Sequence, residues 1–136
     1  MLDLPDSLPK GICHCDFDFS NLLFQSDQLV AVLDFDDANY TYLTFDLACL
    51  IDSWAWPHQF DALDFGQARK IVQVYTKYRP LSPVEQQHLF DVHKLAILFD
   101  GIWFFKRGQA NNFYERQKIE FLDNLRSEKY AESIFC

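Results

Sequence analysis

The chain is poor in glycine, in long apolar runs and in positive charge, and each shortage excludes a class of protein. Its 136 residues include only four glycines, and no two of them are close enough to form a glycine-rich phosphate-binding loop. The longest apolar stretch, residues 95–105, contains Asp100 and is far shorter than a membrane span. The formal net charge of −8 provides no basic stripe for a phosphate backbone. We therefore expect a protein that binds neither nucleic acid nor a membrane.

The cysteine content and the first residues indicate a reducing compartment. Four cysteines in a chain of this length do not form the pattern of a secreted disulfide scaffold. Residues 1–6 have neither the basic region nor the apolar region of a signal peptide. With 49% hydrophobic residues, the chain can build one domain with a core. The sequence therefore predicts a single soluble domain in the cytoplasm.

Acidic residues are distributed unevenly along the chain. Residues 1–64 contain twelve acids, all of them aspartate, and a single base, Lys10. Aspartate favours turns and helix caps over helix interiors. The first half is therefore expected to contain loops that hold carboxylates at defined points, although an acidic solvated surface would have the same composition.

Apolar spacing in the first half predicts an irregular lead-in, a hairpin and a helix. Residues 1–10 contain two prolines and are expected to be irregular. The apolar runs 21–24 and 29–33 are separated by four polar residues, which predicts a β-hairpin. The apolar segment 45–56 ends at Pro57 and predicts a buried helix.

Three more helices are expected in the second half. Between residues 66 and 78, apolar residues recur at the spacing of one helix face, and they are Ala68, Ile71, Val72, Tyr75 and Tyr78. Ser82, Pro83 and Glu85 have the order of an N-cap, a first-turn proline and a capping box.

The helix that this box opens is expected to run to about Phe105. Because it is apolar on nearly all sides from Leu95 onward, it should lie in the middle of a helical core. Gly108 is expected to end it, and residues 112–129 should form a last helix.

Two segments carry residues typical of phosphoryl transfer. The first fits the pattern H-x-D-x-x-x-x-N through His14, Asp16 and Asn21, and the second is an apolar strand that ends in Asp34 and Phe35. In that chemistry one aspartate accepts the proton of the substrate hydroxyl. The asparagine and a second aspartate, beyond the following hairpin, hold the magnesium ions that bridge the nucleotide phosphates. The sequence therefore predicts a catalytic base and a metal site in residues separated by one hairpin.

Other sites fit parts of the same segments. Asp36 could also contact the metal. Cys13, His14 and Cys15 invite a zinc site, but zinc sites usually combine such residues with a second pair, and the remaining cysteines are single and distant. The aspartates could instead form a two-metal hydrolase site or a glycosidase pair, which would leave His14 and Asn21 without a role.

Five stretches carry a resemblance to a known family: residues 11–16, 21–24, 32–35, 42–48 and 78–81. Over residues 5–125 the chain resembles the C-terminal lobe of the aminoglycoside/choline/homoserine phosphotransferases, and type II homoserine kinases are the most similar. The resemblance implies a mainly α fold with a small β-hairpin, the helical lobe of the protein-kinase-like phosphotransferase fold. It divides the chain into a lead-in (1–10), a catalytic loop with a metal-binding hairpin (11–40) and a helical bundle (41–130).

The resemblance also implies roles for single residues. Asp16 would be the catalytic base, and His14 would brace its loop. Asn21 and Asp34 would bind the metal of the nucleotide, and Asp46 would fix the catalytic loop from the helix behind it. Cys15 departs from the pattern, since the family usually has a small residue there, often glycine.

By the same resemblance, the cofactors would be ATP and Mg²⁺, and the substrate an amino-bearing alcohol such as homoserine. A complete member also needs an N-terminal lobe with a strand lysine paired to a helix glutamate. The only base before the catalytic loop is Lys10, and no glutamate precedes Glu85. We therefore expect a catalytic lobe without activity of its own, and a homodimer formed through the surface that the absent lobe would cover. The alternative is a non-catalytic helical interaction module.

Overall fold

The computed structural model describes residues 4–56, 62–108 and 114–136. Four strands lie in its first part: β1 (Lys10–Cys13), β2 (Leu22–Gln25), β3 (Gln28–Val32) and β4 (Asn39–Tyr42). Strand β1 pairs antiparallel with β4, and β2 pairs antiparallel with β3. In the chain, the inner ladder (β2 and β3) is therefore inserted between the two strands of the outer ladder (β1 and β4). This nesting brings the two connecting loops, residues 14–21 and 33–38, together at the end of the outer ladder.

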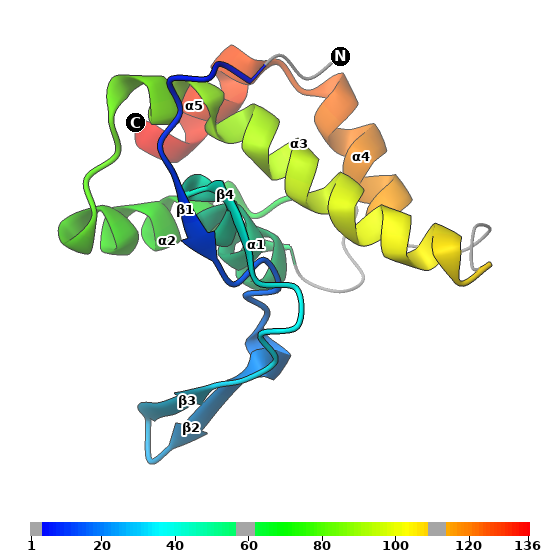
Figure 1. Ribbon diagram of the computed structural model, residues 1–136. Coiled ribbons are helices and arrows are strands. Elements are labelled where there is room, and N and C mark those ends of the chain that lie inside the picture. The colour runs from blue at the N-terminus through cyan, green and yellow to red at the C-terminus, as the bar shows by residue number, and fades with distance from the viewer. Residues whose placement is uncertain (1–3, 57–61, 109–113) are drawn as a thin grey trace.

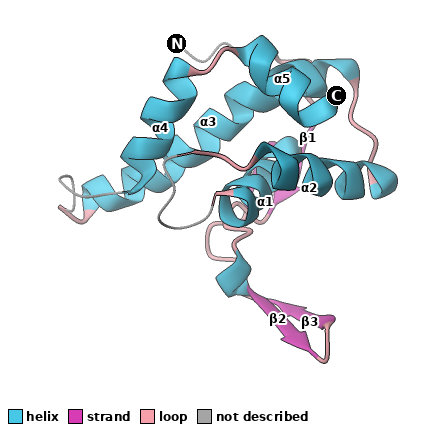
Figure 2. Ribbon diagram, turned by 180° about the vertical axis from the view of Figure 1, so that it is seen from behind, coloured by secondary structure: helices cyan, strands magenta, loops and turns pink. Residues whose placement is uncertain are grey.

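The inner ladder projects from the helical body, as both views show (Figures 1 and 2). The predicted hairpin is confirmed, but its turn contains two residues rather than four, because Gln25 pairs with Gln28. Ser26 and Asp27 form the turn with φ of 48° and 63°. Positive φ at both central residues matches the twist of a two-residue hairpin, and aspartate tolerates that conformation.

Five helices form the rest of the described chain: α1 (Thr44–Ala55), α2 (Phe65–Tyr78), α3 (Pro83–Lys106), α4 (Tyr114–Asn124) and α5 (Ser127–Phe135). The helices predicted over 45–56, over 66–78 and from the capping box onward are confirmed. In that box Ser82 N–H donates to the Glu85 carboxylate at 2.9 Å, and Glu85 N–H lies 3.4 Å from Ser82 Oγ. Gly108, with φ of 72°, follows the end of α3 as expected.

The single last helix predicted over residues 112–129 is wrong. Residues 112 and 113 lie outside the described part of the chain, and the helix beyond them breaks after Asn124 into α4 and α5. The break lets α5 bury Tyr130 and Ile134, each 1% exposed, in the main core. The helical pattern of the sequence did not distinguish two helices at an angle from one.

Two predictions of burial are also wrong. Tyr78, which belongs to the apolar face predicted for residues 66–78, is 87% exposed at the last residue of α2. The C-terminal half of α3 is only partly covered, and four of its large apolar side chains are exposed: Leu98, Phe99, Ile102 and Phe105. This half extends past the body of the molecule, so neighbouring helices cover only part of its surface (Figure 1).

The helices enclose one main core and one smaller cluster. The main core contains residues of all five helices, and the smaller cluster joins β1 and the following loop to α1 and α3. Cys13 and Cys15 belong to this second cluster, together with Ala48. Of the helices that the structure describes, none combines the length and apolarity needed to span a bilayer. The second cluster is what ties the loop 14–21 to the helical body.

Candidate functional site

Helix α1 holds the beginning of the loop 14–21 through one carboxylate. The N–H groups of His14 and Cys15 donate to Oδ2 and Oδ1 of Asp46, each at 2.9 Å. His14 and Cys15 are 5% and 4% exposed, so these N–H groups lie where water cannot easily replace a lost acceptor. Asp46 therefore fixes the backbone at this point with two charge-assisted hydrogen bonds.

The backbone conformation of Cys15 explains why a small residue, often glycine, is usual at this position. Its φ is 66°, in the left-handed region that glycine reaches without strain and most side chains avoid. The neighbouring Asp46 contact at Cys15 N–H holds the residue in this conformation. A strained residue at this position is consistent with a loop whose geometry matters.

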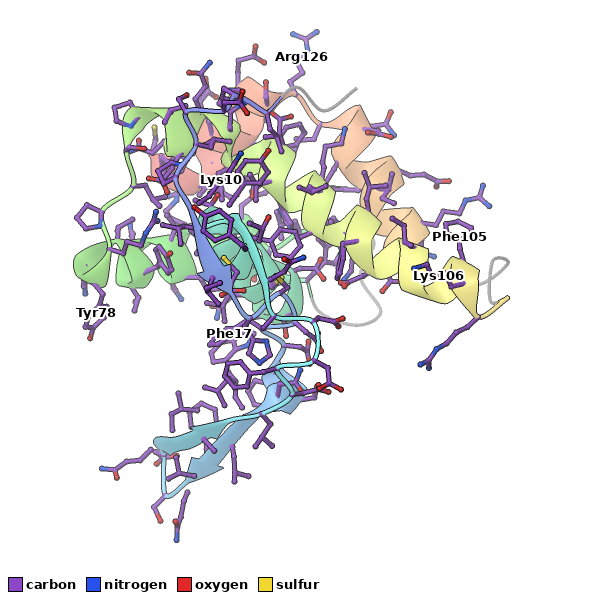
Figure 3. All side chains as sticks on the ribbon, in the orientation of Figure 1. Lys10, Phe17, Tyr78, Phe105, Lys106 and Arg126 are labelled. Atoms are coloured by element: carbon purple, nitrogen blue, oxygen red, sulfur yellow. The ribbon has the colours of Figure 1, made fainter. Side chains whose placement is uncertain are left out.

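His14 connects the two loops. Its Nε2 donates to the carbonyl oxygen of Leu33 at 2.7 Å, while Nδ1 accepts from Asp16 N–H at 3.3 Å. Because Nδ1 accepts a hydrogen bond from the backbone, it carries no proton, and the ring is the neutral form with its proton on Nε2. The ring also contacts Phe35 edge-on, with 4.6 Å between centroids, and Phe17 at 5.6 Å. Phe17 lies at the base of the projecting hairpin (Figure 3).

Asp16 and Asn21 contact each other directly. Asn21 Nδ2 donates to Asp16 Oδ2 at 2.8 Å and to the Asp16 carbonyl oxygen at 2.9 Å. Both donor hydrogens of the amide are thus used. No hydrogen bond from the described residues reaches Asn21 Oδ1, so this oxygen is available to a ligand.

Asp34 lies in the second loop, directly after the residue that is hydrogen-bonded to Asn21 at the end of the β2–β3 ladder. Leu33 N–H donates to the Asn21 carbonyl oxygen at 2.8 Å, which brings the residue before Asp34 against the end of the first loop. Asp34 has a positive φ of 59°, is exposed and lines the same cavity as Asp16 and Asp36. Its side chain therefore does not enter the core.

The oxygen donors at the junction of the two loops suit a magnesium ion in part. Carboxylate and amide oxygens are the protein ligands that Mg²⁺ prefers, and Asn21, Asp34 and Asp36 supply them. Among the described residues, however, no group of three or more histidine, cysteine or acidic side chains is arranged to hold a metal. The donor set fits an ion that is held by one or two carboxylates and completed by phosphate oxygens.

The thiols of Cys13 and Cys15 are buried in the smaller cluster, and no metal-binding group among the described residues includes them. Burial, with a further contribution from Asp46, raises the pKa of Cys13 to about 11, and burial also raises the pKa of Cys15. Cys13 Sγ donates to the Tyr42 carbonyl oxygen at 3.3 Å. Protonated, hydrogen-bonded thiols are poor zinc ligands, which need the thiolate form.

The two loops open on a cavity of about 700 Å³. Asp16, Asp34 and Asp36 line it from the loops. Residues of the helices, and Arg107 just after α3, complete the lining without having been singled out by the sequence motifs; among them are Asp52, Ser53, Asp100, Lys106 and Glu115. The sequence signal for Asp100 was its place inside an otherwise apolar run, whereas Asp52 and Ser53 carry no motif. Most of the charged groups that face this space are acidic.

Asp52, Asp100 and Glu115 form an acidic wall of this cavity, and their carboxylates have different surroundings. Asp52 is balanced by Lys118, whose Nζ lies 2.6 Å from Asp52 Oδ2. Burial raises the pKa of Asp100 to about 7, with repulsion from Asp52 adding to the effect and Lys118 opposing it. Among the described residues, Oδ1 of Asp52 and Oε2 of Glu115 are covered and make no hydrogen bond, and His93 Nε2 lies 3.9 Å from Asp52 Oδ1. Because acidic side chains outnumber basic ones in the lining of the cavity, the wall favours a donor or a cation.

Comparison with known proteins identifies a family and individual relatives. Residues 1–81, which include both loops and α1, match the family described as the phosphotransferase enzyme family. The homoserine kinase of Bartonella henselae (strain Houston 1) is 35% identical over 81 residues, which cover 60% of this chain and 25% of that protein. The family match therefore spans the positions of His14, Asp16, Asn21, Asp34 and Asp46.

Two further relatives have the same name and similar coverage. The homoserine kinase of Parvibaculum lavamentivorans is 32% identical over 97 residues, 71% of this chain and 28% of that protein. The homoserine kinase of Afipia carboxidovorans is 36% identical over 87 residues, 62% of this chain and 26% of that protein. The matched part of the chain thus spans about a quarter of the length of these relatives.

Proposed function

Because the chain belongs to the phosphotransferase enzyme family, we propose that it is the catalytic, helical C-terminal lobe of a cytoplasmic, ATP-dependent small-molecule kinase. The reaction is transfer of the γ-phosphate to the hydroxyl of an amino-bearing alcohol, homoserine or a similar compound. One observation carries the proposal. The nested ladders place Asp16 beside Asn21 and bring Asp34 to the same cavity.

In this proposal each loop residue has one task. Asp16 accepts the proton of the substrate hydroxyl as the oxygen attacks the phosphorus. Its position depends on Asn21, which donates to its carboxylate, and on Asp46, which holds the backbone just before it. His14 keeps the two loops in register through Leu33.

The metal that accompanies ATP would be held by Asn21 Oδ1 and by the carboxylates of Asp34 and Asp36. When bound there, Mg²⁺ neutralises the charge that develops on the transferred phosphate. Few protein ligands are available, so the lobe alone should bind the ion weakly, in roughly the millimolar range. Manganese, which has the same preference for oxygen, should compete for this place.

The acidic wall supports a substrate that carries an ammonium group. In the part of the chain that the structure describes, Asp100 makes no hydrogen bond or ion pair, and no hydrogen bond reaches the covered Oε2 of Glu115. An ammonium group offers three donors and a positive charge, and would compensate these carboxylates. Lys106 and Arg107 line the same cavity and could receive an anionic group of the substrate.

The test is to supply the nucleotide-binding lobe. We expect no measurable turnover from the isolated chain, because the four glycines of its sequence are too far apart to cover a phosphate and no glutamate precedes Glu85, and catalysis in this class depends on positioning and electrostatics. Fused to the N-terminal lobe of one of the homoserine kinases it resembles, it should phosphorylate an amino-bearing alcohol in the presence of ATP and Mg²⁺. Asp16→Asn should abolish this turnover. Asp27→Asn, the same substitution in the exposed hairpin turn, should not.

A correctly folded fusion that binds ATP and phosphorylates none of homoserine, choline and an aminoglycoside would refute the proposal. It would favour the second candidate, a non-catalytic helical interaction module. Turnover that survives Asp16→Asn would refute the assignment of the base while leaving the kinase activity in place.

A further inference from the structure

Helix α1 contacts the loop 14–21 at two points that are seven residues apart. Asp46 accepts from the backbone at the beginning of the loop, and Ser53 contacts Asp18 and Phe19 in its second half. Residues seven apart lie on the same face of a helix, about 10.5 Å from each other along its axis. The helix therefore lies along the loop and supports both of its halves.

We propose that Ser53 is a positioning residue of the catalytic loop, whose hydroxyl holds the turn that presents Asn21 to Asp16. This inference rests on the proposed function, because the loop matters for catalysis only if Asp16 and Asn21 take part in it. Ser53 also lines the cavity, as does Asp18, its partner in the loop.

The hydrogen bonds of Ser53 have only one possible direction. Its Oγ donates to Asp18 Oδ2 at 2.7 Å and accepts from Phe19 N–H at 3.0 Å. The backbone N–H can only donate, and an ionised carboxylate can only accept. A hydroxyl group meets both requirements at once, which an alanine methyl cannot do.

Asp18 links Ser53 to Asn21 through hydrogen bonds with the backbone of the short helix that follows it. Its Oδ1 accepts from Ser20 N–H at 2.8 Å, and its carbonyl oxygen accepts from Asn21 N–H at 3.1 Å. These contacts cap the short helix η1 (Phe19–Asn21). Both carboxylate oxygens of Asp18 therefore accept hydrogen bonds, one from Ser20 N–H and one from the Ser53 hydroxyl.

The experiment follows the Asn21 side chain in the chain itself, without added nucleotide. In ¹⁵N–¹H spectra the Asn21 amide of the wild type should differ from a free asparagine amide, because it donates to Asp16. Ser53→Ala should move this signal toward the free position, and Ser53→Thr, which keeps the hydroxyl, should leave it in place. Ser133→Ala is the matched control, since Arg69 contacts the backbone carbonyl of Ser133 and no hydrogen bond from the described residues involves its hydroxyl.

A second readout is the affinity for Mn²⁺, measured by water-proton relaxation. Loss of the Ser53 hydrogen bonds should weaken binding by roughly threefold to tenfold, while Ser53→Thr and Ser133→Ala should change it less than twofold. An Asn21 signal that does not move in Ser53→Ala, in a protein whose other signals show that it is folded, would overturn the proposal. A movement that Ser53→Thr fails to prevent would also overturn it.

The proposed function can fail separately. In that case the Asn21 signal would respond to Ser53→Ala as expected, while the fusion with a nucleotide lobe would show no phosphoryl transfer. If the wild type binds no Mn²⁺ at millimolar concentration, the metal assignment of Asn21 and Asp34 fails, and the amide signal still decides the role of Ser53.

Discussion

Asp46 offers the sharpest test of how the loop 14–21 is held. Both of its carboxylate oxygens accept from buried N–H groups, at 2.9 Å each. A hydrogen bond to a charged group contributes about 1.5–3 kcal/mol, and a buried donor that loses its partner costs a similar amount. Asp46→Asn keeps one acceptor oxygen and turns an NH₂ group toward the other donor. We therefore expect it to lower the free energy of unfolding by about 1.5–3 kcal/mol.

Asp64→Asn is the matched control for this measurement. Asp64 is the N-cap of α2, and its carboxylate accepts from Gln67 N–H at 3.0 Å. Asparagine caps a helix about as well as aspartate, so this substitution should cost less than about 0.5 kcal/mol. Both aspartates lie at the beginning of a helix, so the loss of charge near the helix dipole is similar in the two variants.

Urea unfolding followed by circular dichroism, at equal protein concentration, gives both values. Asp46→Ala, which removes both acceptors, should cost about 3–5 kcal/mol. Equal stabilities of Asp46→Asn and Asp64→Asn would refute the reasoning, because they would show that the two buried N–H groups do not need the carboxylate. If Asp46→Ala does not fold, the comparison of the two asparagine variants remains decisive.

Three further predictions concern the acidic wall, the hairpin and the thiols. Asp100→Asn should stabilise the fold at pH 8 and change little at pH 4. The folded pKa of about 7 means that the native chain keeps a proton there that the unfolded chain releases, so stability falls as the pH rises from 4 to 7; a difference that does not vary with pH would contradict this. Leu23 and Leu29 are 51% and 50% exposed on the hairpin, so the isolated chain should self-associate, and replacing both by lysine should shift its sedimentation toward a monomer. A wild type that is already monomeric at high concentration would count against it. In the folded chain, Ellman's reagent should modify the exposed Cys136 well before the buried Cys13, whereas equal rates would contradict the raised pKa of Cys13.

Local signals in the sequence predicted the elements that depend on local physics. The hairpin depends on two apolar runs around a polar turn, and α3 begins at a capping box whose reciprocal hydrogen bonds form as expected. The outer ladder of β1 and β4 was not predicted. Its strands contain four residues each and pair Lys10 with Tyr42 across more than thirty positions, so no local pattern indicates the pairing. The exposure of the C-terminal half of α3 was missed for a related reason, because the composition of a helix does not show how many neighbours cover it.

For the site, the motif spacing predicted the loops that meet but not the groups that support them. Asp16 and Asn21 are five residues apart and contact each other directly. Ser53 and Asp100 lie on helices far along the chain, with no motif around them, and reach the cavity only through the packing of α1 and α3. A serine in a helix has no sequence signature that separates a positioning residue from a surface residue.

The backbone itself distinguishes the two loops from the rest of the described chain. Among the described residues, four that are not glycine have a positive φ: Cys15, Ser26, Asp27 and Asp34. Ser26 and Asp27 form the hairpin turn, which requires that conformation. Cys15 and Asp34 are not in tight turns, and such a conformation costs roughly 1–2 kcal/mol for a residue with a side chain. The hydrogen bonds of Asp46 to Cys15 and of His14 to Leu33, next to Asp34, are placed to offset that cost. Cys15 directly precedes the expected catalytic base, and Asp34 is an expected metal ligand. Backbone strain at such positions, held by neighbouring groups, is typical of a functional site rather than of an accidental group of aspartates.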